Sequence, residues 1–141
     1  MRASGSQRGF TLIELLVVIT ILSILAAFAI PRFAALEVEA RTSARDALAV
    51  RIRSGAALSH ALWLAQGQPA NVTMEDQTIA MMNGYPSRAT INGTIGDLTG
   101  FTYAAGTGVF LKTGGAATCT VRYAEAAGAN AAPTITIGGA C

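Results

Sequence analysis

Hydrophobic residues fill one long stretch near the start of the chain. Between Phe10 and Pro31 the only charged residue is Glu14. At about 1.5 Å of rise per residue, a helix over 10–31 covers roughly 30 Å, the thickness of a bilayer core. The pattern therefore predicts a membrane-spanning helix. Pro31 lacks a backbone donor, so it predicts a kink near the end of this stretch.

Beyond Pro31 the apolar positions recur at steps of three and four residues, which is typical of one face of a helix. The predicted inner face comprises Phe33, Leu36, Ala40, Ala44, Ala47, Leu48, Ile52, Ala56, Ser59 and Trp63. Charged residues, Arg45 among them, fill mainly the other faces. No strong stop occurs before Gly67 and Pro69, so the amphipathic half of the helix is expected over 32–66.

Past Pro69, short β-like runs alternate with Gly, Asn, Pro and Thr. The predicted strands are 70–74, 78–82, 100–104, 108–112, 118–123 and 134–137. The last run, TITI, alternates strictly, as a half-buried strand does. The string NGYP at 83–86 predicts a turn in a loop-rich region. The predicted fold is therefore α+β, a long, kinked N-terminal helix packed against a C-terminal antiparallel sheet in the region 70–141.

The charge distribution predicts how the helix is oriented in the membrane. Residues 1–9, MRASGSQRG, are polar and basic, which is typical of a cytoplasmic leader. Positive charge before an apolar run keeps that end in the cytoplasm, so 32–141 is expected to form a globular domain outside it. The alternative is a secretory signal with its exit near Ala26, Ala27 and Ala29, although such signals have a shorter apolar region.

The expected domain has balanced charge. Ten Lys and Arg residues face eight Asp and Glu residues in the whole chain, and Arg2 and Arg8 belong to the leader. The remaining basic residues therefore equal the acidic ones in number. A neutral domain without a basic stripe gives no case for general nucleic-acid binding.

Two cysteines, Cys119 and Cys141, lie in the last quarter of the chain. In a domain outside the cytoplasm an even count indicates one disulfide. A bond at Cys141 would also hold a chain end that otherwise frays. The alternative is a pair of buried free thiols. The segment 120–140 between the cysteines is expected to be exposed and available for partner contact.

No residue pattern indicates catalysis or a cofactor. His60 is the single histidine, expected on the helix surface, and a lone histidine is more often structural than a ligand. The acids of the C-terminal half, such as Asp97 and Glu125, are too scattered for a calcium site. No nucleotide-binding loop, zinc motif or catalytic triad occurs. The sequence therefore predicts a non-enzymatic protein without a cofactor or metal.

The string GFTLIELLVVITILSILAAFAIPRF, residues 9–33, resembles the N-terminal signature of type IV pilins and their pseudopilin relatives. The resemblance implies that prepilin peptidase removes the leader 1–9 by cutting between Gly9 and Phe10, and that the new amine of Phe10 is N-methylated. It also implies that Glu14 faces the N-terminal amine of a neighbouring subunit during assembly. A carboxylate in a bilayer costs on the order of 2.5–3.5 kcal/mol, which a cationic partner would offset. The alternative is a carboxylate near enough to the interface to stay hydrated.

A second resemblance is narrower. The segment EARTSARDALAVRIRSGAALSHALWLA, NGYP at 83–86, CTVRY at 119–123 and the terminal Cys141 are similar to mannose-sensitive haemagglutinin (MSHA) pilins. This implies a structural subunit of a type IV pilus used in adhesion. The implied partners are further copies of the chain in a helical filament, prepilin peptidase and the inner-membrane assembly machinery.

The same resemblance implies two successive locations, the inner membrane as a single-pass protein with a cytoplasmic N-terminus, and then the extracellular pilus. Two alternative functions stay open. One is a type II secretion pseudopilin, whose relatives typically use calcium in place of a disulfide. The other is a minor pilin or tip adhesin.

Overall fold

The structure is a computed structural model that describes residues 9–129 and 131–141. These residues divide into two compact parts, one that ends at Glu37 and one over Val38–Cys141. Of the predicted leader 1–9, all but Gly9 lies outside the described residues. The division falls inside one helix, so the two parts share a continuous backbone.

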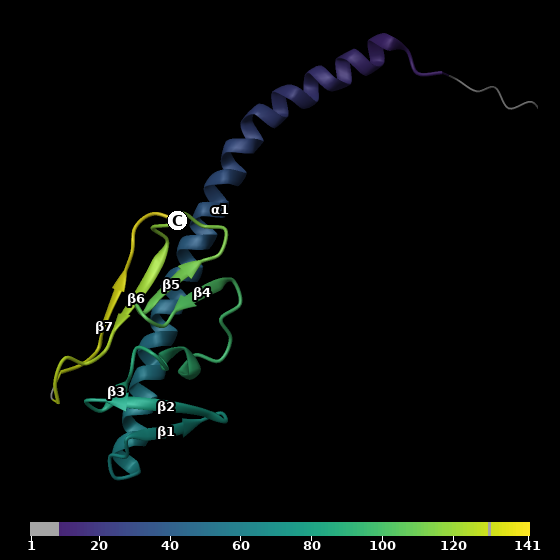
Figure 1. Cartoon of the computed structure of the whole chain (residues 1–141). Coiled ribbons are helices and arrows are strands. Elements are labelled where there is room, and N and C mark those ends of the chain that lie inside the picture. Colours follow the sequence, from purple (N-terminus) through teal and green to yellow (C-terminus); the bar gives the residue numbers. More distant parts are fainter. Residues whose placement is uncertain (1–8, 130) are drawn as a thin grey trace, which may run out of the picture. The chain divides into compact units, whose positions relative to one another are not determined.

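Helix α1 runs over Leu12–Ala65 and has 54 residues (Figure 1). It continues through Pro31, as predicted. A kink at Pro31 stays a prediction. In a helix this residue removes one donor from the backbone ladder.

The C-terminal end of α1 is a Schellman motif. The Gln68 N–H donates to the Trp63 carbonyl at 2.9 Å, and the Gly67 N–H donates to the Leu64 carbonyl at 3.3 Å. Gly67 has φ +78°, the left-handed conformation that this motif requires and that glycine adopts without strain. The Trp63 indole N–H also donates to the Pro69 carbonyl at 2.9 Å. The chain therefore reverses direction here through local contacts alone.

A three-stranded antiparallel sheet follows the helix, built from β1 (Asn71–Met74), β2 (Gln77–Met82) and β3 (Tyr85–Pro86). The β2–β3 turn is Asn83–Gly84, with φ of +53° and +86°, as a tight hairpin turn requires. The turn was predicted, whereas β3 was not. Pro86 is tolerated in β3 because this strand lies at the edge of its sheet.

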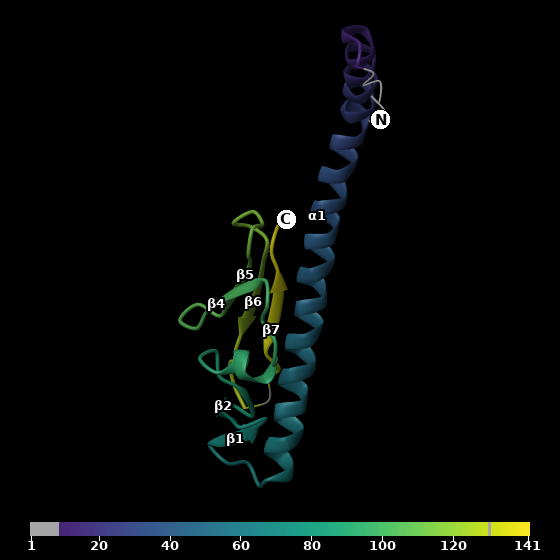
Figure 2. The ribbon, with the colours of Figure 1, turned by 90° about the vertical axis from the view of Figure 1, so that its right-hand side faces the viewer.

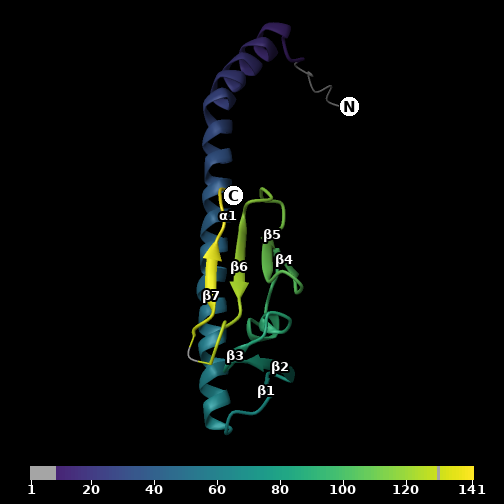
Figure 3. The same cartoon turned by 60° about the vertical axis from the view of Figure 1, so that its left-hand side comes forward.

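The second sheet has four strands in chain order, each antiparallel to the next. They are β4 (Phe101–Ala104), β5 (Val109–Lys112), β6 (Thr120–Ala124) and β7 (Thr134–Ile137). A short 3-10 helix, η1 (Ile91–Thr94), lies between the two sheets in the chain. Strands β6 and β7 run along the helical residues 38–65 (Figures 2 and 3). The predicted α+β class is confirmed, with two antiparallel sheets where one was expected.

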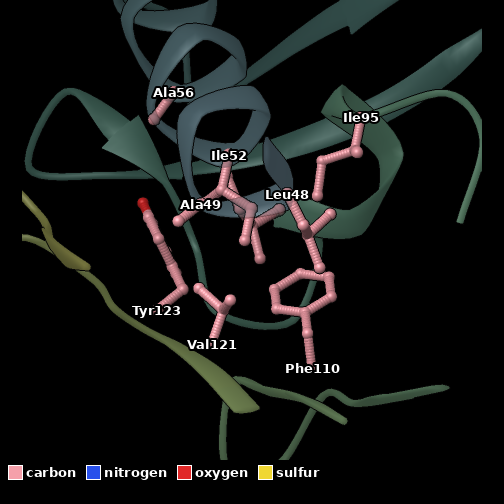
Figure 4. Close-up of a cluster of buried hydrophobic side chains, with 9 residues drawn as sticks. Leu48, Ala49, Ile52, Ala56, Ile95, Phe110, Val121 and Tyr123 are labelled. Carbon is pink, nitrogen blue, oxygen red and sulfur yellow. The ribbon is translucent and has the colours of Figure 1, made fainter. Parts of the chain in front are cut away.

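The main core of the second part forms where α1 meets β5 and β6. Its buried side chains are Leu48, Ala49, Ile52, Ala56, Ile91, Ile95, Phe110, Val121 and Tyr123. Figure 4 shows the strand side chains pointing toward the helix. Four predicted inner-face residues, Leu48, Ile52, Ala56 and Ser59, are confirmed by their burial.

Five predictions about the faces of the helix were wrong. Ala40 and Ala47, expected on the inner face, are exposed. Phe33 and Leu36, expected on the inner face, are exposed, since their part of the helix ends before the globular domain begins. Arg45, expected on an outer face, is only 8% exposed. Its burial is possible because its charge is paired and its donors are engaged.

Candidate functional site

The helical residues 12–30 present apolar side chains on every side. The exposed large hydrophobic residues include Leu12, Ile13, Leu15, Leu16, Val17, Val18, Ile19, Ile21, Leu22, Ile24, Leu25, Phe28 and Ile30. By length and composition α1 could cross a membrane, and its most apolar window is not buried at all. A soluble monomer rarely leaves so large an apolar surface in water. This segment therefore needs lipid or other protein around it.

The polar side chains within this segment satisfy their donors locally. The Thr20 hydroxyl donates to the Leu16 carbonyl at 2.7 Å, and the Ser23 hydroxyl donates to the Ile19 carbonyl at 2.7 Å. Each bond reaches back one helical turn. These two hydroxyls therefore do not interrupt the apolar character of the segment.

Glu14 and Thr11 form a capping box at the start of α1. The Thr11 N–H and hydroxyl both donate to Glu14 Oε2, at 3.0 and 2.7 Å, and the Glu14 N–H lies 3.3 Å from Thr11 Oγ1. Thr11 directly precedes the helix, and Glu14 occupies its third position. This arrangement satisfies backbone donors that the first turn leaves free.

The capping box was missed from the sequence, although the spacing Thr-x-x-Glu before an apolar run is its known signal. The capping box also affects the charge of Glu14. The Glu14 carboxylate already has two donors from its own chain and lies beside the positive end of the helix dipole. The negative charge of Glu14, which has no cationic partner between Phe10 and Pro31 in the sequence, is thus partly stabilised by Thr11 of the same subunit.

Phe10 and Glu14 lie together at the N-terminal end of the segment. They line one shallow groove with Ile13, Val17 and Val18. Phe10 is 77% exposed, and a side chain at Gly9 would meet no atom within 4 Å. Among the described residues, Gly9 and Phe10 at the predicted cut are therefore exposed, and Phe10 and the predicted assembly residue Glu14 share one surface.

The predicted disulfide between Cys119 and Cys141 is confirmed, with 4.5 Å between the two Cα atoms. The expectation that 120–140 would be exposed was wrong in part. Val121 and Tyr123 are fully buried, because β6 contributes them to the core.

His60 lies on α1 and contacts the β2–β3 hairpin. Its ring stacks on Tyr85 with 4.3 Å between centroids and 6° between planes, and its Nδ1 lies 2.6 Å from the Gly84 carbonyl oxygen. Trp63 adds a second ring contact at 5.7 Å. The sequence placed His60 near Trp63 but not against Tyr85. Within 9–129 and 131–141, no group of three His, Cys, Asp or Glu residues could hold a metal ion.

The N-terminal segment matches a known protein family. The family described as "Prokaryotic N-terminal methylation motif" matches residues 4–30, so the chain carries this motif. The motif includes Gly9, Phe10 and Glu14. It thus covers the cap, the shared groove and most of the apolar segment.

The chain is also similar to type IV major fimbrial proteins. It is 38% identical over 89 residues to the type IV major fimbrial protein FimA of Dichelobacter nodosus, covering 57% of this chain and 54% of the relative. It is 48% identical over 52 residues to the type IV narrow pilus major component PilA5 of Thermus thermophilus, covering 37% of this chain and 45% of the relative. The chain thus spans about half the length of the curated relatives it matches.

No solved structure matches the chain. The family match and the similarities to FimA and PilA5 confirm the predicted resemblance to type IV pilins. They also confirm the predicted non-enzymatic class, because the relatives are structural proteins of fimbriae and pili.

Proposed function

We propose that the chain is a structural subunit of a type IV pilus of the MSHA kind. Prepilin peptidase removes residues 1–9 by cutting between Gly9 and Phe10, and the new amine of Phe10 is N-methylated. The observation that carries the proposal is the exposed apolar segment 12–30, which holds one acid, Glu14, a single turn from Phe10.

The same segment serves twice in this proposal. Before assembly it spans the inner membrane, where the Thr11 donors stabilise the Glu14 carboxylate. Cleavage then creates a cation on Phe10, which needs an anionic partner once it leaves water. The Glu14 carboxylate of a neighbouring copy supplies that partner, and the exposed apolar residues of successive copies bury one another in the filament.

This function requires three kinds of partner and two successive locations. The partners are prepilin peptidase, the inner-membrane assembly machinery and further copies of the chain. The subunit enters the inner membrane with its N-terminus in the cytoplasm and ends in an extracellular filament that attaches cells to surfaces.

Mass spectrometry of filaments sheared from cells that express the chain tests this proposal. We expect a mature chain that begins at N-methylated Phe10. An intact leader, or cleavage after Ala29, would overturn the proposed processing. The variant Glu14→Gln keeps the shape but removes the charge, so it should abolish filaments while the processed protein stays in the membrane. Glu39→Gln, an exposed acid beyond the apolar segment, is the matched control and should leave filaments intact.

A type II secretion pseudopilin would share this N-terminal segment. The Cys119–Cys141 disulfide favours a pilin over that alternative, because it ties down the C-terminal region where those relatives typically use calcium. An intact mass lower by two hydrogens, with no change in unfolding temperature on calcium addition, would support the pilin. A large stabilisation by calcium would favour the pseudopilin.

The abundance of the chain in sheared filaments separates a major subunit from a tip adhesin. A major subunit dominates the filament protein. A tip adhesin occurs at a few copies per filament.

A further inference from the structure

Arg45 joins helix α1 to the C-terminal tail, which we define as residues 138–141. Its Nη1 donates to the Gly138 carbonyl at 3.2 Å and to the Gly139 carbonyl at 2.5 Å. Its Nε and Nη2 lie 2.9 and 2.8 Å from Asp46 Oδ1. The Arg45 side chain is only 10% exposed, whereas that of Asp46 is 50% exposed. The guanidinium is thus fixed by Asp46 on one side and holds the tail on the other.

The rest of the tail is held in the same way. The Thr118 hydroxyl donates to the Ala140 carbonyl at 2.8 Å, and the Ala116 N–H donates to the Cys141 carbonyl at 3.4 Å. All four carbonyl groups of the tail therefore accept a hydrogen bond from another part of the domain. None of these bonds involves a sulfur atom.

The two glycines of the tail permit this close approach. A Cβ on Gly138 would lie 2.6 Å from the Thr118 carbonyl oxygen, and one on Gly139 would lie 3.2 Å from the Thr118 Cβ. Thr118 directly precedes Cys119, so these contacts bring the tail to the first cysteine. The C-terminus lies beside α1 in all three ribbon views (Figures 1, 2 and 3).

We propose that Arg45 is a positioning residue for formation of the Cys119–Cys141 disulfide. By holding the tail on the folded domain, it keeps the Cys141 thiol beside the Cys119 thiol before any bond joins them. The fold then acts as the template for oxidation. Preorganisation of this kind raises the effective concentration of one thiol at the other.

The chemical step is a two-electron thiol–disulfide exchange with an external disulfide, for which oxidised glutathione is the probe. The Cys141 thiolate attacks one sulfur of the probe, forms a mixed disulfide and releases one glutathione thiolate. The Cys119 thiolate then attacks the Cys141 sulfur and releases the second glutathione thiolate. The protein thiols are oxidised and the probe is reduced, and the two protons pass to the two thiolates that leave.

The test uses the full-length chain in detergent micelles, equilibrated with reduced and oxidised glutathione. The oxidised fraction, measured by alkylation and mass spectrometry, gives the effective concentration of the two thiols. Arg45→Met removes every donor but keeps the apolar stem, so we expect a loss of roughly tenfold or more. Arg51→Met is the matched control, because Arg51 also donates to two backbone carbonyls, those of Ile95 and Asp97, away from the tail. It should leave the value unchanged.

A milder pair of variants keeps the test meaningful if Arg45→Met folds poorly. Thr118→Val removes the donor to the Ala140 carbonyl and should lower the effective concentration roughly threefold. Thr107→Val removes a comparable hydroxyl bond, to the Ala104 carbonyl at 3.3 Å, at another exposed site. It should have no effect.

A local readout separates positioning from general stability. In the Cys119→Ser background no disulfide can form, and the alkylation rate of Cys141 reports how firmly the tail is held. Adding Arg45→Met should raise this rate several-fold, whereas adding Arg51→Met should not. Equal effects of the two arginine variants, or no effect of Arg45→Met on either measurement, would overturn the proposal.

Discussion

The hydroxyl group of Tyr123 donates a hydrogen bond of 2.7 Å to the carbonyl oxygen of Pro86 inside the globular domain. Tyr123 is in β6 and Pro86 is in β3, so this bond joins the four-stranded sheet to the three-stranded one. Both side chains are fully buried. The bond therefore requires a protonated Tyr123.

Alkaline pH is expected to weaken the domain through Tyr123. Burial raises the pKa of Tyr123 well above its usual value, and the charge of Glu125 adds to the shift. Below the unfolded-state pKa of about 10, both states keep the proton and the stability is complete. Above it the unfolded state loses the proton first, so the free energy of unfolding falls by up to about 1.4 kcal/mol per pH unit.

Urea unfolding between about pH 8 and pH 11 checks this slope. Tyr123→Phe should flatten it, and should lower stability near pH 8 by about 1–3 kcal/mol because the Pro86 carbonyl loses its donor. Burial also raises the pKa of Tyr103, so a smaller slope should persist in the variant. An unchanged slope in Tyr123→Phe would contradict the prediction.

Loss of the capping box should loosen only the first turn of α1. Thr11→Val removes the hydroxyl that contacts Glu14, at an expected local cost of about 1 kcal/mol. Hydrogen exchange of the amides at 12–14, measured in detergent micelles, should accelerate roughly fivefold. Thr20→Val is the control, because its hydroxyl contacts a carbonyl within the helix. Equal acceleration in both variants would argue against a capping role for Thr11.

The β1–β2 turn offers a stabilising change. Its two residues, Glu75 and Asp76, have φ of +45° and +62°, a region that non-glycine residues rarely adopt. Replacing them together by Asn and Gly should raise the unfolding free energy by about 1 kcal/mol. Thermal unfolding checks this change. Asn83→Glu, in the other two-residue turn, should act in the opposite direction, and a gain in both variants would refute the argument.

Gly55 is expected to resist substitution although it lies in a helix. A Cβ there would lie 2.5 Å from Thr94 Oγ1 and 2.9 Å from the Thr94 carbonyl oxygen. Alanine favours the helix by about 1 kcal/mol, but overpacking costs about 1–3 kcal/mol. Gly55→Ala should therefore be neutral to destabilising by about 2 kcal/mol, as measured by urea unfolding. Adding Thr94→Ala removes one of the two clashes and should recover part of the loss.

Much of the architecture could be predicted because its signals are local. The left-handed Gly67 ends α1 at Ala65, within one residue of the predicted end. The alternating run TITI is β7, with the bounds predicted for it. Strand β3 was missed because it is only two residues long, and its proline is typical of a turn. Its pairing with β2 depends on the neighbouring strand.

The misplacement of Arg45 has a different cause. Polarity along the sequence assigns an arginine to the solvent, whereas its acceptors in the tail lie 93 and 94 positions away. No local pattern contains that information. The stacking of His60 on Tyr85 escaped prediction for the same reason. The Thr11–Glu14 cap is local, by contrast, and could have been predicted from its spacing.

Apart from the disulfide, the side chains of Arg45 and Thr118 hold residues 138–141 through main-chain oxygens of the tail. Beyond the two glycines and Cys141, the fold therefore places little restriction on the identity of the tail side chains. Ala140 is exposed, and its carbonyl, not its methyl group, makes the contact with Thr118. Position 140 can consequently change its size, polarity or charge while the end of the chain keeps its path. The domain surface at position 140 is therefore open to substitution without a change of fold.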